Sequence, residues 1–443
     1  MLKRTRSFLV LVMLLMTVTM SAQVTTATMS GKVTAQDEPI IGATIVAIHE
    51  PSGTRYGTVT NVSGQFNLQG MRTGGPYKVE ISYVGYQTAI YKGINLLLGE
   101  NYVLNVSLKE SSELLDEVVV TASKESNMKS DRAGAIMNAN RDMISNTPTI
   151  SRSISDIMRL SPQGADVGNG FAVGGGNYRQ SFVTVDGAAF NNTFGLGGNL
   201  PANGSPISLD ALEQVTVAVT PFDVRQSGFT GGAINAVTRS GDNQFRGTAY
   251  MYFNNENLKG SKVDDYELLR SKAQYYTYGA SFGGPIIKDK LFFFVNGEYE
   301  DNVTAGSNYR PRTALGESYS GGNIHRPLQS DMDDMRGFLL NKYNFDPGKY
   351  NDYSTDTPAY RVMARVDWNA NQNNKVSFRF TKTHTKDSNF PTSSVSPLST
   401  SALYPGGTST EVIDGKPVGT IAPGQGRTSK YALSFSNSNY YQV

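Results

Sequence analysis

The sequence of 443 residues contains no cysteine and only three histidines. Without cysteine the chain has no disulfide bonds and no thiolate metal sites, and it cannot be anchored as an acylated lipoprotein. His49, His325 and His384 lie in different segments, so no histidine-based metal or catalytic centre is indicated. The net charge is only +2, with 40 basic and 38 acidic residues, and this balance does not favour nucleic-acid binding.

Long apolar runs are absent after residue 23, where no stretch approaches the roughly twenty apolar residues of a membrane helix. A mature chain in a membrane would therefore have to cross it as a β-barrel, the other fold that satisfies every backbone group in lipid. Residues 8–18 are apolar, follow Lys3, Arg4 and Arg6, and precede the small residues Ser21 and Ala22. This pattern predicts a signal peptide over residues 1–22, cleaved after Ala22. The alternative is a buried N-terminal helix.

Short apolar strands follow the signal, separated by turn residues at spacings of about 8–12 residues. They cover residues 43–48, 56–60, 64–68, 78–83 and 102–108, with a further strand starting at Val33. The spacing predicts an all-β sandwich over residues 23–109.

Four stretches of this sandwich, residues 31–33, 39–45, 60–66 and 81–86, resemble the carboxypeptidase-regulatory-like domain. That resemblance implies a prealbumin-like sandwich, related to carbohydrate-binding folds. Asn61 stands where the family usually has aspartate, so the resemblance carries no cation site here.

A strand-forming string lies in the polar segment 110–130 that follows the sandwich. Its three consecutive valines come after acidic residues and have no hairpin partner nearby. An isolated extended segment is suited to pair with another protein as an added edge strand. The alternative is a last strand of the sandwich. The string resembles the TonB box of Bacteroidetes-type TonB-dependent receptors, which implies that it binds the TonB energy-transducing complex in the periplasm. The box residues are Asp116, Glu117, Val118, Val119, Val120, Thr121 and Ala122.

Residues 131–241 mix short helices and strands. We predict a helix over residues 151–160, strands over 181–185 and 215–219, and a long loop over 187–207. Three motifs, at residues 183–187, 212–217 and 228–239, resemble in order and spacing the plug of TonB-dependent receptors. The plug-motif residues that this resemblance implies are Asp186, Gly187, Gly231, Gly232 and Arg239. A phosphate-binding loop at residues 174–176 is the competing interpretation, but no Lys-Ser/Thr pair follows it.

Strands of about ten residues with alternating polarity begin at Phe245. They cover residues 245–253, 274–283, 291–299, 360–368, 375–381 and 430–435. Their connections alternate between long and short, which favours an outer-membrane barrel over a soluble antiparallel sheet. Charged alternates such as Arg361, Arg365 and Asp367 would then face a wet lumen. Plugged outer-membrane transporters need about 22 strands, so we expect residues 242–443 to be a partial barrel and the sequence to be an N-terminal fragment.

The predicted fold is therefore mainly β: a prealbumin-like sandwich, an α+β plug, and the first strands of an antiparallel transmembrane β-barrel. Resemblance to the Oar-like subgroup of TonB-dependent receptors implies an outer-membrane receptor with a periplasmic sandwich. It would take up a nutrient (a glycan, a peptide or a chelate) with energy from TonB. The alternative is a structural or adhesive outer-membrane barrel protein that binds carbohydrate.

The expected partners are the TonB complex, outer-membrane lipid, and an unidentified small-molecule or glycan ligand. We expect no nucleic acid, no cofactor, no metal and no enzymatic activity. The acidic cluster Asp331, Asp333 and Asp334 lacks the glycine and the distal glutamate of a calcium loop, so we expect it to be solvated in an outer loop.

Overall fold

The computed structural model describes residues 25–110, 118–121, 136–149, 152–167, 170–191, 200, 205–219, 231–258, 262–263, 266–267, 272–305, 310–317, 324–350, 354–371, 374–387, 409–413, 416–419 and 440–442. They divide into two compact units. The first holds the sandwich, the plug and the adjoining parts of the long strands, and the second holds the remaining parts of those strands and their long connections. The predicted signal peptide and most of the predicted loop 187–207 lie outside the described residues.

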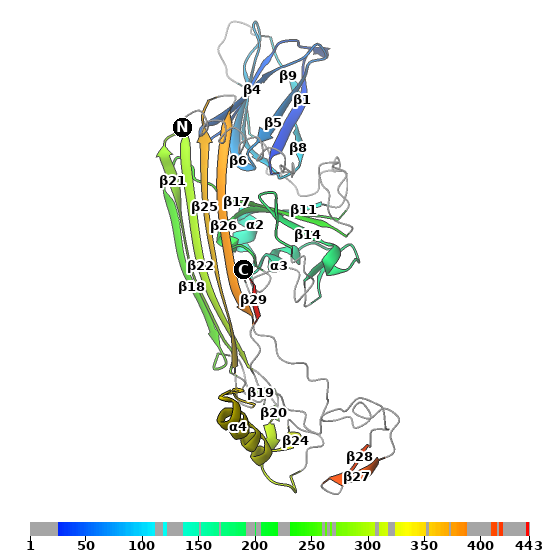
Figure 1. The fold of residues 1–443 in the computed structure, drawn as a ribbon. Coiled ribbons are helices and arrows are strands. Elements are labelled where there is room, and N and C mark those ends of the chain that lie inside the picture. Colours follow the sequence, from blue (N-terminus) through cyan, green and yellow to red (C-terminus); the bar gives the residue numbers. More distant parts are fainter. Residues whose placement is uncertain are drawn as a thin grey trace, which may run out of the picture. The chain divides into compact units, whose positions relative to one another are not determined.

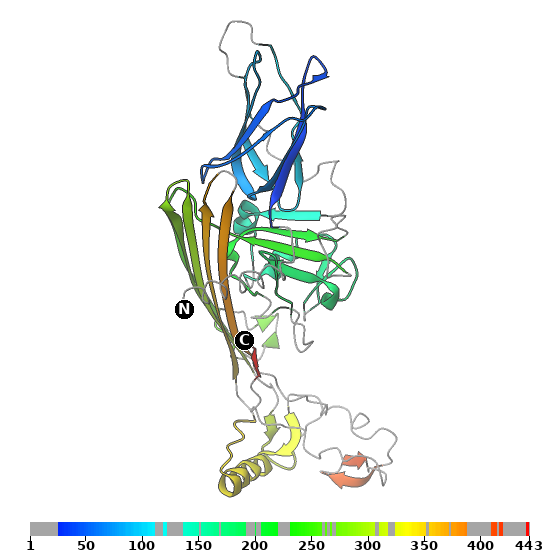
Figure 2. The same ribbon diagram turned by 45° about the horizontal axis from the view of Figure 1, so that its top comes forward.

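The N-terminal domain is a sandwich of two five-stranded sheets (Figure 2). The first sheet contains β1 (Ala27–Ala35), β2 (Glu38–Pro39), β5 (Gln65–Met71), β8 (Asn101–Val103) and β9 (Val106–Ser107). The second has the order β10 (Val118–Thr121), β7 (Ala89–Leu96), β6 (Gly74–Ser82), β3 (Thr44–His49) and β4 (Thr54–Val59). Alternate residues of both sheets enter one apolar core, where Val33, Ile45 and Ile81 are fully buried. The predicted sandwich is confirmed.

Two strands of the second sheet differ from the sequence prediction. Strand β7 was not predicted, because Gly93 has a positive φ of 80° and interrupts the alternation. Strand β10 lies in parallel beside β7 with Val118 opposite Ala89, so this part of the predicted box is the last strand of the sandwich sheet. That is the alternative that the sequence left open.

Asn61 has a structural role in the turn between β4 and β5. Its side-chain oxygen accepts the backbone N–H groups of Ser63 at 3.0 Å and Gln65 at 2.9 Å. Asparagine performs this Asx-type capping as well as aspartate does. The departure from the usual residue of the resembled family therefore leaves the turn intact.

The plug contains a five-stranded sheet with two short helices beside it (Figure 1). The strand order is β11 (Ile136–Asn140), β16 (Leu212–Ala218), β17 (Ala233–Thr238), β14 (Phe182–Val185) and β15 (Ala188–Ala189). The helices are α2 (Arg141–Asn146) and α3 (Ile154–Met158), and a 3₁₀ turn η3 (Leu209–Ala211) precedes β16. The predicted helix is shorter than expected, because the capping box of Ser153 and Asp156 starts it only at Ile154.

The long strands form one antiparallel sheet, which we call the wall (Figure 1). Its order is β18 (Arg246–Asn255), β21 (Gln274–Ile287), β22 (Leu291–Ala305), β25 (Ser354–Asn369), β26 (Lys375–Asp387) and β29 (Tyr440–Gln442). Five predicted strands lie within it, and the predicted strand 430–435 lies outside the described residues. The strands run to 16 residues, longer than predicted. About 9–11 residues suffice for a strand to cross the hydrocarbon core of a bilayer, so strands of this length exceed what a membrane-spanning strand needs.

Side chains alternate between the two faces of the wall as predicted. On β25, Val362 and Trp368 are exposed, whereas Arg361, Met363 and Arg365 are buried. On β26, Phe378 and Phe380 are exposed. The apolar exposed face is the one suited to lipid.

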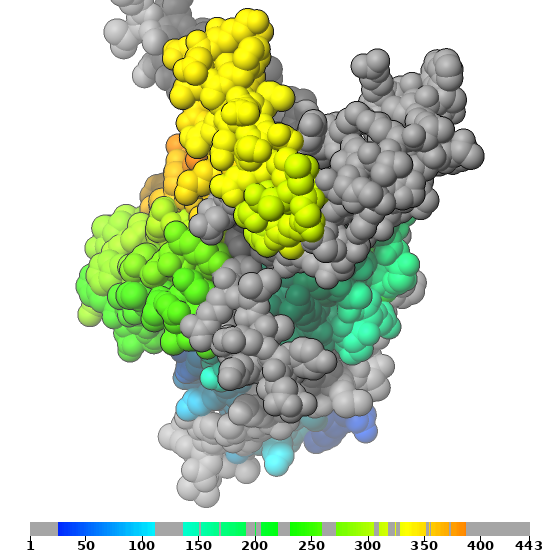
Figure 3. Space-filling model, turned by 90° about the horizontal axis from the view of Figure 1, so that it is seen from below, coloured from blue at the N-terminus to red at the C-terminus, as the bar shows by residue number. Residues whose placement is uncertain are grey.

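The second unit carries helix α4 (Gln329–Tyr343) with β23 (Arg310–Arg312) and β24 (Ile324–Leu328), whose surface Figure 3 shows in lime and yellow. Two further hairpins pair β19 (Lys262–Val263) with β20 (Tyr266–Glu267), and β27 (Ser409–Ile413) with β28 (Lys416–Gly419). Asp331, Asp333 and Asp334 lie on α4 rather than in a loop, and Asp333 accepts the hydroxyl of Tyr350 at 2.6 Å.

In the part of the chain that the structure describes, no group of three or more His, Cys, Asp or Glu residues could hold a metal ion. None of its helices is both long and apolar enough to cross a membrane.

Candidate functional site

The plug is fastened to the wall by a buried ion pair. Arg361 of β25 donates from Nη1 to Oε1 of Glu298 on β22 at 2.9 Å, and both side chains are at most 3% exposed. Ser208 of the plug donates its hydroxyl to the other oxygen of Glu298 at 2.8 Å, and Nε of Arg361 donates to the carbonyl of Ser205. Buried charges are tolerated only when they are paired and hydrogen-bonded. Here the plug supplies part of that pairing.

A second buried cluster holds the end of the central plug strand β17. Arg365 donates to the carbonyl of Thr238 at 2.6 Å and forms two hydrogen bonds with Asp367, at 2.8 Å and 3.1 Å. Ser377 of β26 donates to the same carboxylate at 2.6 Å. Two wall strands and the plug therefore meet at one charged network.

The predicted motif residues Asp186 and Gly187 lie beside this network. Both have positive φ, 51° and 85°, as a two-residue type I′ hairpin between β14 and β15 requires. The Asp186 carboxylate accepts the backbone N–H of Thr238 at 3.0 Å and its hydroxyl at 2.5 Å. Nε of Arg379, from the wall, lies 3.6 Å from the same carboxylate. Asp186 thus bridges plug and wall.

Arg239, another predicted motif residue, anchors the plug in a third place. Its backbone N–H donates to the carbonyl of Ala211 at 2.8 Å, and its guanidinium donates to the carbonyl of Asp210 at 3.0 Å. The guanidinium also lies 4.8 Å from the centre of the Phe294 ring of the wall. Thr248 of β18 donates to the Asp210 carboxylate at 2.6 Å.

The glycine pair Gly231 and Gly232 permits close packing at the start of β17. A Cβ on Gly232 would lie 2.5 Å from the Cγ1 atom of Val173, a side chain that is fully buried. A Cβ on Gly231 would meet Gln180 at 3.3 Å. The backbone carbonyl of Gly232 accepts the N–H of Phe182 at 2.9 Å, so the two chain segments are already in hydrogen-bond contact.

Sequence reasoning missed the anchoring role of the wall charges. Arg361, Arg365 and Asp367 were expected to face a wet lumen, but they are only 2%, 6% and 9% exposed. That expectation was wrong because the plug covers this face of the wall at their level. The alternating pattern identifies which side chains point inward. It does not show that the backbone carbonyls of residues 205 and 238 will accept hydrogen bonds from them.

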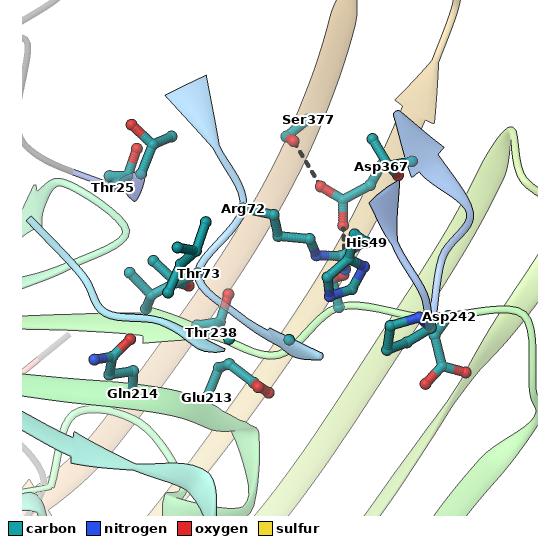
Figure 4. A pocket seen from close by; sticks show the side chains of 18 of the residues that line it. Thr25, His49, Arg72, Thr73, Glu213, Gln214, Thr238, Asp242, Asp367 and Ser377 are labelled. Atoms are coloured by element: carbon teal, nitrogen blue, oxygen red, sulfur yellow. Dashed lines mark hydrogen bonds and ion pairs between the residues drawn. The ribbon is translucent and has the colours of Figure 1, made fainter. Parts of the chain in front are cut away.

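A chamber of about 870 Å³ lies between the sandwich, the plug and the wall. Figure 4 shows Arg72 of the sandwich, Thr238 of the plug and Asp367 of the wall around it. Arg72 donates to the carbonyl of Gly241 at 3.1 Å and lies 4.0 Å from the Asp367 carboxylate. The lining is polar and carries both signs of charge, so it suits a hydrated ligand more than an apolar one.

Further contacts connect the sandwich to the plug and to the short connections of the wall. The backbone N–H of Leu98 donates to the side-chain oxygen of Gln214 on β16 at 3.1 Å. Asn369, at the end of β25, donates to the hydroxyl of Thr54 at 2.9 Å. Nζ of Lys375 lies 3.1 Å from the centre of the Tyr56 ring. The sandwich therefore packs against both elements.

The box residues are only partly described. Asp116, Glu117 and Ala122 lie outside the described residues, whereas Val118 to Thr121 form β10 on the sandwich. Their partner-binding role remains a prediction from the sequence.

His49 is predicted to remain neutral well below neutral pH. It is 5% exposed, its Nδ1 lies 2.7 Å from the Ser52 hydroxyl, and burial, with a contribution from Arg72, lowers its pKa from 6.5 to about 3. The unfolded chain binds a proton on His49 more readily than the folded chain does. The contribution of neutral, buried His49 to the free energy of unfolding is therefore complete above pH 6.5 and is lost as the pH falls towards 3. The free energy of unfolding should fall by up to about 1.4 kcal/mol per pH unit in that window, and His49→Gln should remove this slope. His49 imidazole NMR signals, assigned as those missing from His49→Gln, that titrate near pH 6.5 would contradict the prediction.

Gly232→Ala is predicted to destabilise the plug by about 1–3 kcal/mol, because the fully buried Val173 cannot move away from the added methyl group. The matched variant Gly231→Ala adds the same methyl group where the nearest atom is 3.3 Å away, and it should have a smaller effect. The measurement is the urea concentration at which protease cleaves the plug of the full-length protein. Equal midpoints for the two variants would contradict the packing argument.

Two parts of the chain match known families. Residues 28–109 match the carboxypeptidase regulatory-like domain, and residues 237–414 match the outer membrane beta barrel domain. The solved structure of the siderophore receptor PirA from Acinetobacter baumannii aligns with a TM-score of 0.38 and 16% identity, over 57% of this chain and 32% of that one.

Two curated proteins are similar in sequence. The TonB-dependent transporter Oar of Myxococcus xanthus is 27% identical over 256 residues, which cover 56% of this chain and 22% of Oar. The TonB-dependent receptor SusC of Bacteroides thetaiotaomicron is 29% identical over 269 residues, 57% of this chain and 24% of SusC. The chain thus spans less than a quarter of the length of these relatives. On these domain matches, the chain contains a carboxypeptidase regulatory-like domain and part of an outer membrane β-barrel domain, and over more than half of its length it is similar to TonB-dependent receptors.

Proposed function

We propose that this receptor takes up a nutrient across the outer membrane with energy supplied by a TonB complex in the periplasm. The two curated relatives are a TonB-dependent transporter and a TonB-dependent receptor, which supports transport rather than enzymatic catalysis. The ligand class is a glycan, a peptide or a chelate, and the polar chamber suits a hydrated ligand of this kind.

The observation that carries the proposal is the direct chain connection between the predicted box and the edge of the plug sheet. After β10, the next described strand is β11, which pairs with β16 at the edge of that sheet. A pull on the box therefore reaches an edge strand first. The neighbouring strands β16 and β17 stay in place, because Arg365 holds the carbonyl of Thr238 at the end of β17.

Moving β11 would open the chamber. The chamber is lined in part by the residues that end β11 and begin α2, namely Asn140, Arg141 and Asp142. Asn138 of β11 donates to Glu100 of the sandwich at 2.6 Å and accepts the Thr216 hydroxyl of β16 at 2.5 Å. Withdrawing β11 breaks these contacts and removes one side of the chamber. A ligand bound on the side of the plug that faces away from the periplasm then gains a path towards the periplasm.

Deleting residues 116–121 from the full-length receptor is predicted to reduce uptake to the level of cells that lack the receptor, because the transducing partner loses its strand. The matched control deletes residues 123–128, an equal length of the polar segment, and should retain uptake. The measurement is uptake of, or growth on, candidate glycans, peptides and chelates. Receptor abundance in the outer membrane is measured alongside.

Unchanged uptake after deletion of residues 116–121 would contradict transport by this mechanism. It would favour the structural or adhesive alternative, in which neither the box nor the plug takes part in transport. Loss of uptake in both deletions would show that segment length, rather than the box, is what matters.

A further inference from the structure

The chamber between the sandwich, the plug and the wall is lined by more positive than negative charge. Six basic and four acidic side chains belong to its lining. Its volume of about 870 Å³ lies within the range of pockets that bind small molecules. Lys375 and Asp142 in the lining are exposed, so a solute can reach the chamber from solvent. The charges that are not already paired within the protein decide which ligand the chamber can bind.

The carboxylate of Asp367 has closer donors than Arg72. Arg365 donates to both of its oxygens, at 2.8 Å and 3.1 Å, and Ser377 donates to one of them at 2.6 Å. The guanidinium of Arg72 faces the same carboxylate at 4.0 Å, beyond hydrogen-bond distance (Figure 4). Among the described residues, this guanidinium donates only to the carbonyl of Gly241, at 3.1 Å. Its other N–H donors are available to a ligand.

The guanidinium of Arg379 on β26 also has no hydrogen-bonded carboxylate. Its Nε lies 3.6 Å from the carboxylate of Asp186, whose oxygens accept the N–H and the hydroxyl of Thr238. The Arg379 side chain forms no hydrogen bond with any residue that the structure describes, although its Nε is shielded from solvent. The positive charges of Arg365 and Arg72 lie close enough to repel it. An anionic group bound beside Arg379 and Arg72 would relieve this repulsion and accept their hydrogen bonds.

We propose that Arg72 of the sandwich and Arg379 of the wall form a binding site for a carboxylate group of the ligand. This inference rests on the proposed function, since it concerns the nutrient that the receptor takes up. A carboxylate has two oxygens that match the paired donors of a guanidinium group, and both arginines line the chamber. The proposed ligand is therefore an acidic peptide, an acidic glycan or a chelate that carries a carboxylate.

The test is binding to the purified full-length receptor without a TonB complex, measured by isothermal titration calorimetry at constant ionic strength. One pair of probes is tri-glutamate and tri-glutamine with blocked termini, and the other is trigalacturonate and its methyl ester. The unmodified receptor should bind at least one acidic probe about tenfold more tightly than its neutral counterpart. In Arg379→Gln this binding should weaken by about tenfold or more, because one of the two guanidinium groups is lost.

The matched control is Arg246→Gln. Arg246 also lines the chamber, but its guanidinium lies 3.6 Å from the Asp242 carboxylate and donates to the side chain of Gln244 at 2.9 Å. This variant loses the same charge and should bind the acidic probe almost as the unmodified receptor does. Arg379→Lys, which keeps the charge but not the paired donors, should bind with intermediate affinity. The Nε–Hε NMR signal that is missing from Arg379→Gln should shift when the acidic probe is added.

Equal binding of acidic and neutral probes by the unmodified receptor would overturn the carboxylate site. Equal weakening in Arg379→Gln and Arg246→Gln would do the same. The proposed function is tested separately, by uptake in the receptor that lacks residues 116–121. If that uptake is unchanged while the purified receptor binds the acidic probe through Arg379, the carboxylate site stands and the proposed function is contradicted.

Discussion

The structure depends on the requirement that charged side chains on the inner face of the wall be paired. Arg361 and Glu298 are almost fully buried, and each forms a further hydrogen bond with the plug, Arg361 with the carbonyl of Ser205 and Glu298 with the hydroxyl of Ser208. Removing one partner of such a pair costs about 3–5 kcal/mol, because the other charge is left unpaired. The same side chains therefore complete the inner face of the wall and fix the position of the plug.

As a result, one part of the plug sheet is held by a charged side chain and another part mainly by backbone hydrogen bonds. Strand β17 ends at a carbonyl bound by Arg365, whereas β11 is joined to the sheet by a five-residue ladder to β16. Each ladder hydrogen bond contributes only about 0.5–1.5 kcal/mol net, so the ladder to β16 can be broken one weak contact at a time, whereas breaking a buried charged pair is a single larger step.

Much of this could be predicted from sequence because the signals are local and periodic. Alternation identified the wall strands and the inward position of Arg361, and the predicted strand over residues 181–185 corresponds to β14. Gly93 interrupts the alternating pattern of β7, so neither this strand nor the pairing of β10 with it was predicted. The partners of the buried arginines were also beyond reach. Their contacts with the plug join residues more than a hundred positions apart, namely Arg361 with Ser205 and Arg365 with Thr238.

Paired charges on the wall hold the plug. The most direct test is amide hydrogen exchange in β16 of the full-length receptor with Glu298→Ala, which leaves the Arg361 charge buried without its carboxylate. Exchange in this variant is expected to be about 100-fold faster or more than in the unmodified protein. The double variant Glu298→Met/Arg361→Met, which removes both charges, should exchange almost as slowly as the unmodified protein. Unchanged exchange in Glu298→Ala would contradict the claim.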